Sequence, residues 1–163
     1  MLGQVRVLIV GALALASCKS DASTEAAPGA ARTAARDPLL DVALPTGAAR
    51  VEGKNFHVDA AALPGCAAGA VCTAVADLTA LNDFKVNRDY PYKFVADAAV
   101  AKDGTTLDGA ATFAPTGVHT GRLIIKFRRA SAAPTQVAGT FKLSVCSADV
   151  CQIETAALAI AVP

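Results

Sequence analysis

The chain of 163 residues has no tryptophan, one methionine, two tyrosines and six phenylalanines, so aromatic residues make up only 5% of it. Apolar residues nevertheless reach 53%, and much of that share is alanine. Aromatic side chains bury the largest areas, so a core built from Val, Leu, Ile and a few rings gains less from packing. We therefore expect a fold whose stability depends on cross-links as well as on its core.

Histidine and net charge are also scarce. The two histidines, His57 and His119, have no companion at metal-ligand or triad spacing, and the sequence has no glycine-rich phosphate loop or nucleophile motif. Basic residues number 15 against 14 acidic ones, and Arg6 lies in the leader described below, so the rest of the chain is neutral. Nucleic acid binding requires a positive patch. The sequence thus predicts no metal, no cofactor and no nucleic acid partner, and it disfavours any enzyme outside redox chemistry.

The first 18 residues, MLGQVRVLIVGALALASC, have the pattern of an export signal. Arg6 supplies a short positive segment, residues 7–14 are apolar, and the small residues Ala16 and Ser17 precede Cys18. The apolar run is shorter than the roughly 20 residues that a membrane-spanning helix requires. The tetrapeptide Leu-Ala-Ser-Cys resembles the lipobox of bacterial lipoproteins, in which the cysteine receives diacylglycerol before the chain is cut in front of it.

That resemblance implies a cleaved signal peptide at residues 1–17, a lipidated Cys18 and permanent attachment to a membrane through the lipid. Lys19 follows the cysteine, and in lipoproteins an aspartate at that position favours retention in the inner membrane. The implied location is therefore the cell envelope, at the outer membrane and facing the periplasm. A plain secretory signal with an incidental cysteine is one alternative, and an uncleaved membrane helix is another.

Two regions follow the leader. Residues 18–49 are rich in Ala, Ser, Thr, Pro and Gly, with a brief apolar cluster at Leu39 and Leu40, and they bury too little apolar surface to offset the entropy of ordering them. This composition predicts a flexible stalk. In residues 50–163 the apolar pattern has a period of two and turn residues recur, which predicts one all-β domain. We expect an immunoglobulin-like antiparallel sandwich of about seven strands.

The alternation also locates individual strands. We expect them at residues 55–60, 71–81, 84–94, 108–115, 121–129 and 140–146, with a last strand that buries Leu158, Ile160 and Val162. In the segment 121–129, the side chains of Leu123, Ile125 and Phe127 should point inward. The outward arginines and lysine of that segment, Arg122, Lys126, Arg128 and Arg129, predict a solvated basic face. Pro91 lacks an amide hydrogen, so the segment 84–94 is an edge strand or is broken near Asp89, and we expect its tyrosines to pack rather than to bind a ligand.

Four cysteines remain after Cys18, an even number that fits disulfides in an oxidising compartment. Cys66 and Cys72 bracket a short turn at Gly69, and we expect a structural bridge between them. Cys146 and Cys151 bracket four residues, which would make them opposed partners in a final hairpin. The strand phase places both on the outward side, and strained, exposed disulfides are the labile ones. Crossed pairings between the two sets remain the alternative.

A family resemblance bears on the second pair. The stretch FKVNRDYPYKF at residues 84–94, together with GTFKLSVCSADVCQIETAALAIAV at residues 139–162, resembles the N-terminal periplasmic domain of the thiol:disulfide interchange protein DsbD. The resemblance spans residues 50–163 and implies an immunoglobulin-like sandwich in which Cys146 and Cys151 form a redox pair. The family has five residues between these cysteines where this chain has four. The chain has no electron carrier of its own, so a thioredoxin-like redox partner is implied.

The sequence therefore leaves two functions open. The one that we favour is a non-catalytic domain that binds or supports an envelope protein. The other is thiol-disulfide exchange through Cys146 and Cys151, with Cys66 and Cys72 as a structural bridge in either case.

The leader gives a direct test. Because the Cys18 thiol is the predicted lipid acceptor, Cys18→Ala should leave an unprocessed precursor that carries residues 1–17, whereas the control Ser20→Ala should be acylated and cut as usual. Intact mass spectrometry of the membrane fraction separates these products. A mature chain without lipid that begins at another residue would contradict the lipoprotein prediction.

Overall fold

The computed structural model describes residues 36–98 and 104–163, and these belong to a compact unit that begins at Arg36. The leader, Cys18 and the predicted stalk as far as residue 35 lie outside the described residues. No helix in the described ranges is long and apolar enough to cross a membrane. Their elements are η1 (Pro38–Leu40), β1 (Ala49–Glu52), β2 (Phe56–Ala62), β3 (Val71–Ala80), β4 (Lys85–Val86), β5 (Lys93–Ala96), β6 (Thr105–Leu107), β7 (Thr112–Pro115), β8 (Thr120–Arg129), β9 (Thr135–Cys146) and β10 (Cys151–Val162).

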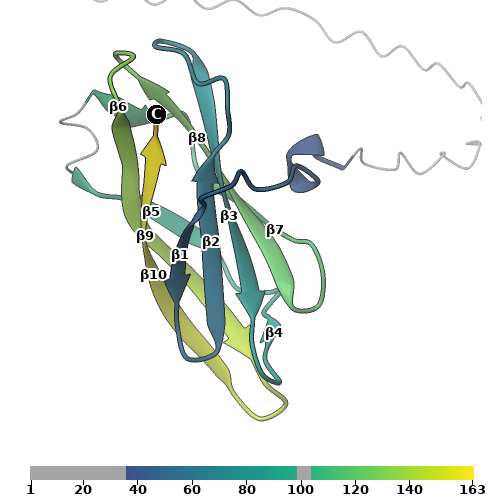
Figure 1. Cartoon of the computed structure of the whole chain (residues 1–163). Coiled ribbons are helices and arrows are strands. Elements are labelled where there is room, and N and C mark those ends of the chain that lie inside the picture. Colours follow the sequence, from purple (N-terminus) through teal and green to yellow (C-terminus); the bar gives the residue numbers. More distant parts are fainter. Residues whose placement is uncertain (1–35, 99–103) are drawn as a thin grey trace, which may run out of the picture. The chain divides into compact units, whose positions relative to one another are not determined.

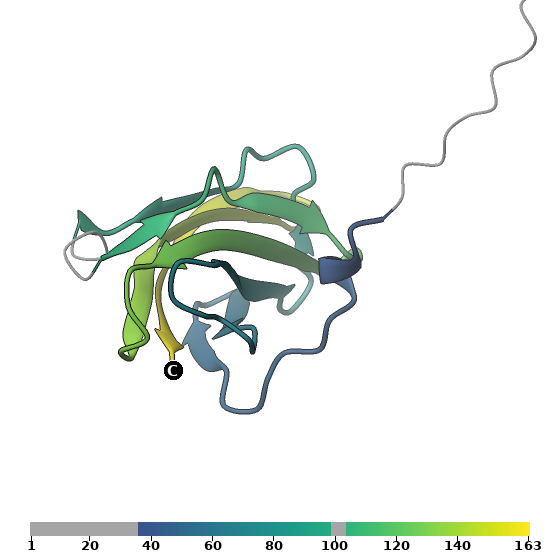
Figure 2. The same cartoon turned by 90° about the horizontal axis from the view of Figure 1, so that it is seen from above.

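The strands form two antiparallel sheets that pack as layers (Figures 1 and 2). Sheet A has the strand order β1-β2-β3-β8-β6, and β7 also pairs with β8. Sheet B has the order β10-β9-β4, and β5 also pairs with β9. The predicted all-β antiparallel sandwich is therefore confirmed.

The described residues contain ten strands rather than about seven. The alternation misses β1 and β6 because strands of four and three residues are too short to establish a period of two. The single strand predicted at residues 84–94 is divided into β4 and β5, and Pro91 lies in the loop between them. Proline has no amide hydrogen to donate to a neighbouring strand, so the strand is broken close to the position that the sequence indicates.

Inward side chains from both sheets form a core cluster. The alternation predicted in β2 and β8 is confirmed, since Phe56, Val58, Leu123, Ile125 and Phe127 are all buried. Many of the remaining members are alanines, and small residues let the layers approach closely. At Gly139 on β9, a Cβ atom would collide with the Val95 carbonyl oxygen and the Phe94 ring of β5. The pairing of β5 with β9 therefore requires glycine at this position.

A row of four charged residues crosses the outer face of sheet A. The register places Arg50 opposite Asp59, Asp59 opposite Asp77, and Asp77 opposite Arg122. Opposed carboxylates repel each other, but each has an arginine on its other side. Arg50 Nε lies 2.7 Å from Asp59 Oδ1, and Arg122 donates to both Asp77 oxygens at 2.6 Å. The hydrogen bond from Arg50 lowers the pKa of Asp59 below its ordinary value.

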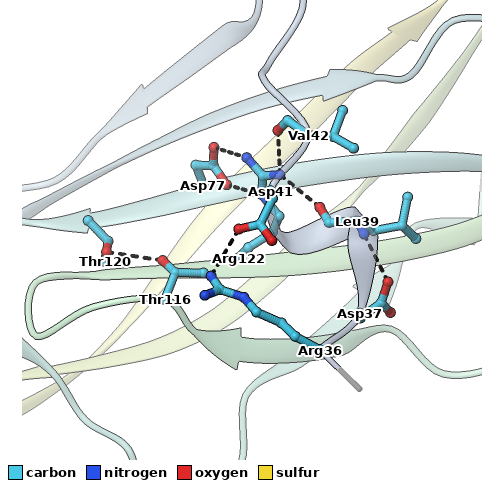
Figure 3. A network of polar contacts seen from close by, with 9 residues as sticks. All are labelled: Arg36, Asp37, Leu39, Asp41, Val42, Asp77, Thr116, Thr120 and Arg122. Atoms are coloured by element: carbon cyan, nitrogen blue, oxygen red, sulfur yellow. Dashed lines mark hydrogen bonds and ion pairs between the residues drawn. The ribbon is translucent and has the colours of Figure 1, made fainter. Parts of the chain in front are cut away.

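Residues 37–42 form a strap over this row. The strap begins with η1, where the Asp37 side chain caps the helix by accepting from the Leu39 amide at 2.9 Å. Arg122 Nη1 donates to the carbonyl oxygens of Leu39 and Val42 at 2.8 and 2.5 Å (Figure 3). One guanidinium thus holds the strap against β8 and, through Asp77, against β3. In Figure 2 the chain continues from η1 to β1 along the outside of the sandwich.

The structure differs from the sequence predictions at the strap and on β8. Residues 36–48 belong to the compact unit, although their composition places them in the stalk, because their bonds to Arg122 use backbone carbonyls that composition does not reveal. The solvated basic face predicted for β8 is wrong at Arg122 and Arg129, which are only 6% and 7% exposed. Arg122 is covered by the strap, and Arg129 donates to the carbonyl oxygens of Cys66 and Pro163.

Removal of the guanidinium should therefore destabilise the domain. Arg122→Met leaves Asp77 and two strap carbonyls without their donor, and we expect a loss of about 2 kcal/mol, or roughly 8 °C in Tm. The matched control Lys126→Met, an exposed residue on the same strand, should change Tm by less than about 2 °C. Thermal melts followed by circular dichroism compare the two, and equal melting temperatures would contradict the role given to Arg122.

Candidate functional site

Two disulfides join the cysteine pairs that the spacing favours. Cys66 is bonded to Cys72 with the Cα atoms 4.9 Å apart, and Cys146 is bonded to Cys151 with the Cα atoms 4.0 Å apart. The crossed pairings left open by the sequence are therefore not the ones formed. The two bridges lie at opposite ends of the sandwich, the first beside the start of β3 and the second between β9 and β10 (Figure 1).

The Cys66–Cys72 bridge belongs to the core. Cys72 lies on β3 opposite Phe127 and is 3% exposed, while Cys66 packs against the core cluster from the preceding loop. Gly69 turns that loop with a φ of +76°, as expected from the sequence, and its amide donates to the Arg129 carbonyl at 2.9 Å. The bridge therefore fastens the β2–β3 loop to the start of β3, and the Gly69 hydrogen bond joins the same loop to β8, so the role of the bridge is structural.

The Cys146–Cys151 bridge closes the β9–β10 hairpin. The two cysteines are directly opposed in the register, and residues 147–150 form the loop between them. The Ser147 hydroxyl accepts from the amides of Asp149 and Val150 at 3.3 and 3.2 Å, which fixes the turn. Cys151 is exposed and Cys146 is half-buried. Both cysteines thus face outward, as the strand phase predicts.

This hairpin leaves the Cys146–Cys151 disulfide open to an attacking thiolate, since Cys151 is exposed. The β9–β10 ladder continues from the cysteines to the pairing of Thr135 with Val162, so the strands stay joined when the sulfur–sulfur bond opens. Val150 directly precedes Cys151 and Ile153 follows it by two residues, and these side chains are 50% and 70% exposed. The arrangement can therefore undergo thiol-disulfide exchange without loss of its strands.

The other residues singled out in the sequence have roles in the fold. His57 Nε2 lies 3.4 Å from Asp59 Oδ2, and His119 Nδ1 lies 2.7 Å from the Phe84 carbonyl oxygen. Within the described ranges no group of three or more His, Cys, Asp or Glu could hold a metal ion.

Tyr92 packs as the sequence predicts. Its ring stacks on Phe113 with the centroids 3.7 Å apart, and its hydroxyl donates to the Ser144 carbonyl at 2.7 Å. Burial of this hydroxyl raises the pKa of Tyr92 to about 12. Tyr92 therefore anchors the β4–β5 loop to β9 and remains protonated at physiological pH.

The sequence does not predict one feature of the domain, a cavity. A cavity of about 510 Å³, open to solvent, lies at the Cys66 end, and its walls include Pro45, Leu63, Pro64 and Pro163. Three separate segments of the chain supply these walls, so neither spacing nor alternation could predict the cavity. The wall is predominantly apolar, and it places no reactive group beside the Cys66–Cys72 bridge.

The fold and the bridges define a class: an all-β sandwich with one disulfide that reaches the core through Cys72 and one that reaches the surface through Cys151. Comparison with models of known protein families gives no match, and comparison with curated proteins gives none. The lipoprotein leader and the resemblance to the DsbD domain accordingly stay predictions from the sequence.

The two bridges should differ in how readily they are reduced. Under graded dithiothreitol, we expect Cys146 and Cys151 to be alkylated first, with the β-sheet circular dichroism unchanged, because the ladder retains the hairpin. Cys66 and Cys72 should react only at higher reductant concentration, and opening their bridge should cost about 2 kcal/mol of stability. Peptide mapping after alkylation gives the order, and simultaneous labelling of all four cysteines on global unfolding would contradict it.

Proposed function

We propose that the protein is a lipid-anchored domain of the cell envelope that binds or supports another protein and does no chemistry itself. The observation that carries this proposal is the location of the side chains whose pKa values are shifted. Among the described residues, the pKa values of Arg50, Asp59, Tyr92 and Arg122 are shifted, and each of these side chains is engaged in a contact that holds strands or loops together. Perturbed groups that serve a reaction converge on one cleft, whereas Arg50, Asp59 and Arg122 lie in the ion-paired row across sheet A and Tyr92 packs from the β4–β5 loop.

The proposed location has separate support. Disulfides persist in oxidising compartments outside the cytoplasm, and this domain has two of them. Together with the leader and the lipobox-like tetrapeptide that ends at Cys18, they favour an exported chain held to a membrane by lipid. A small domain with an alanine-rich core also gains from covalent links, which would each contribute about 2 kcal/mol.

Thiol-disulfide exchange is the second candidate. It is favoured by one specific observation, the outward-facing Cys146–Cys151 bridge across a hairpin that the strand ladder holds independently. In such an exchange a partner thiolate attacks one sulfur, the other leaves as a thiolate, and the partner's second thiol then releases the oxidised partner. The electrons come from that partner dithiol.

The two candidates differ in what they do to a disulfide substrate. If the domain is non-catalytic, it should not accelerate the reduction of insulin by dithiothreitol, measured as turbidity, at catalytic concentrations. Acceleration that is lost in Cys146→Ala/Cys151→Ala but kept in the matched variant Cys66→Ala/Cys72→Ala would overturn the main proposal in favour of exchange. The circular dichroism of both double variants shows that each is folded in the assay.

A further inference from the structure

The outer face of sheet B carries three exposed lysines on neighbouring strands. The register places Lys93 of β5 opposite Lys142 of β9, and it places Lys85 of β4 opposite Cys146, four residues further along β9. All three lysines are exposed. No ion pair among the described residues involves any of them. Asp83, Asp89 and Asp97 flank the lysines of β4 and β5 in the chain, and none of them forms an ion pair with these lysines.

The opposed lysines do not serve the fold. Side chains directly opposite each other in an antiparallel pair have Cβ atoms about 5 Å apart, and like charges in that position are destabilising. On sheet A, the opposed Asp59 and Asp77 are each neutralised by an arginine on the next strand. Lys142 has Thr155 as its other neighbour, on β10, so the repulsion between Lys93 and Lys142 has no such compensation.

Exposed apolar side chains accompany the lysines. Val95 lies two residues after Lys93 on β5 and is 41% exposed, and Ile153 on β10 is 70% exposed. These residues share the outward parity of their strands with the lysines. The face thus combines uncompensated positive charge with apolar area, which suits a partner that is acidic and partly apolar.

We propose that the outer face of sheet B, formed by Lys85, Lys93, Lys142, Val95 and Ile153, docks an acidic segment of another envelope protein. Carboxylates of that segment bind the lysines, and an apolar side chain packs against Ile153. This inference rests on the proposal that the domain functions by binding.

The test uses the mature chain from residue 18, produced without acyl groups, and fluorescent poly-L-glutamate as the probe. Binding is measured by anisotropy at low salt. Lys93→Gln/Lys142→Gln should weaken binding about tenfold. The control Lys54→Gln/Lys126→Gln removes the same charge from exposed positions outside the face and should weaken binding less than about twofold. The first variant should also melt at a higher temperature than wild type, because it removes the repulsion, and the control should not.

Three outcomes would overturn the inference. Equal loss of binding in both variants would mean that net charge, not this face, attracts the probe. Binding to phosphatidylglycerol vesicles without binding to poly-L-glutamate would assign the face to lipid. Absence of both, in a chain that cells acylate normally at Cys18, would remove the docking face while leaving the lipid-anchored domain intact.

Discussion

The guanidinium of Arg122 makes the contact on which the arrangement of sheet A depends. It donates to both oxygens of Asp77 and to two carbonyls of the strap, so it joins β3, β8 and residues 37–42 at one point. With Arg50 it also compensates the opposed carboxylates of Asp59 and Asp77, which would otherwise repel each other across β2 and β3. The fixed register then presents an alternating inner face to sheet B, and a core poor in aromatic residues can close against it.

The two disulfides reinforce this core to different degrees. Cys72 is itself a core residue, and its bridge fastens a loop that Arg129 also holds through the Cys66 carbonyl. The Cys146–Cys151 bridge lies on the outer surface, at the end of a long strand pair that the β9–β10 ladder also joins. Its position on sheet B places Cys146 beside Lys85 of the proposed docking face.

The alternation of apolar residues and the spacing of the cysteines predict the features that depend on residues close together in the chain. The inward phase of Leu123, Ile125 and Phe127 and the pairing of cysteines across short loops follow from neighbours in the chain, and both are confirmed. The same phase correctly directs Arg122 outward, but it cannot reveal that backbone carbonyls 80 and 83 residues earlier cover it. The sequence likewise does not predict that Lys93 lies opposite Lys142. Their register depends on the break in the strand at Pro91 and on the close approach of β5 to β9 at Gly139.

The central claim is that one bridge is part of the core and the other is separable from it, and the reduction potentials of the two disulfides test it most directly. Equilibration of the folded domain with glutathione and dithiothreitol buffers, followed by peptide mapping, gives each value. The Cys66–Cys72 bridge, which is anchored in the core by Cys72, should lie below about −300 mV, and the Cys146–Cys151 bridge should lie at least ~30 mV higher, which corresponds to ~1.4 kcal/mol. Equal potentials, or a lower value for Cys146–Cys151, would contradict the separation of roles.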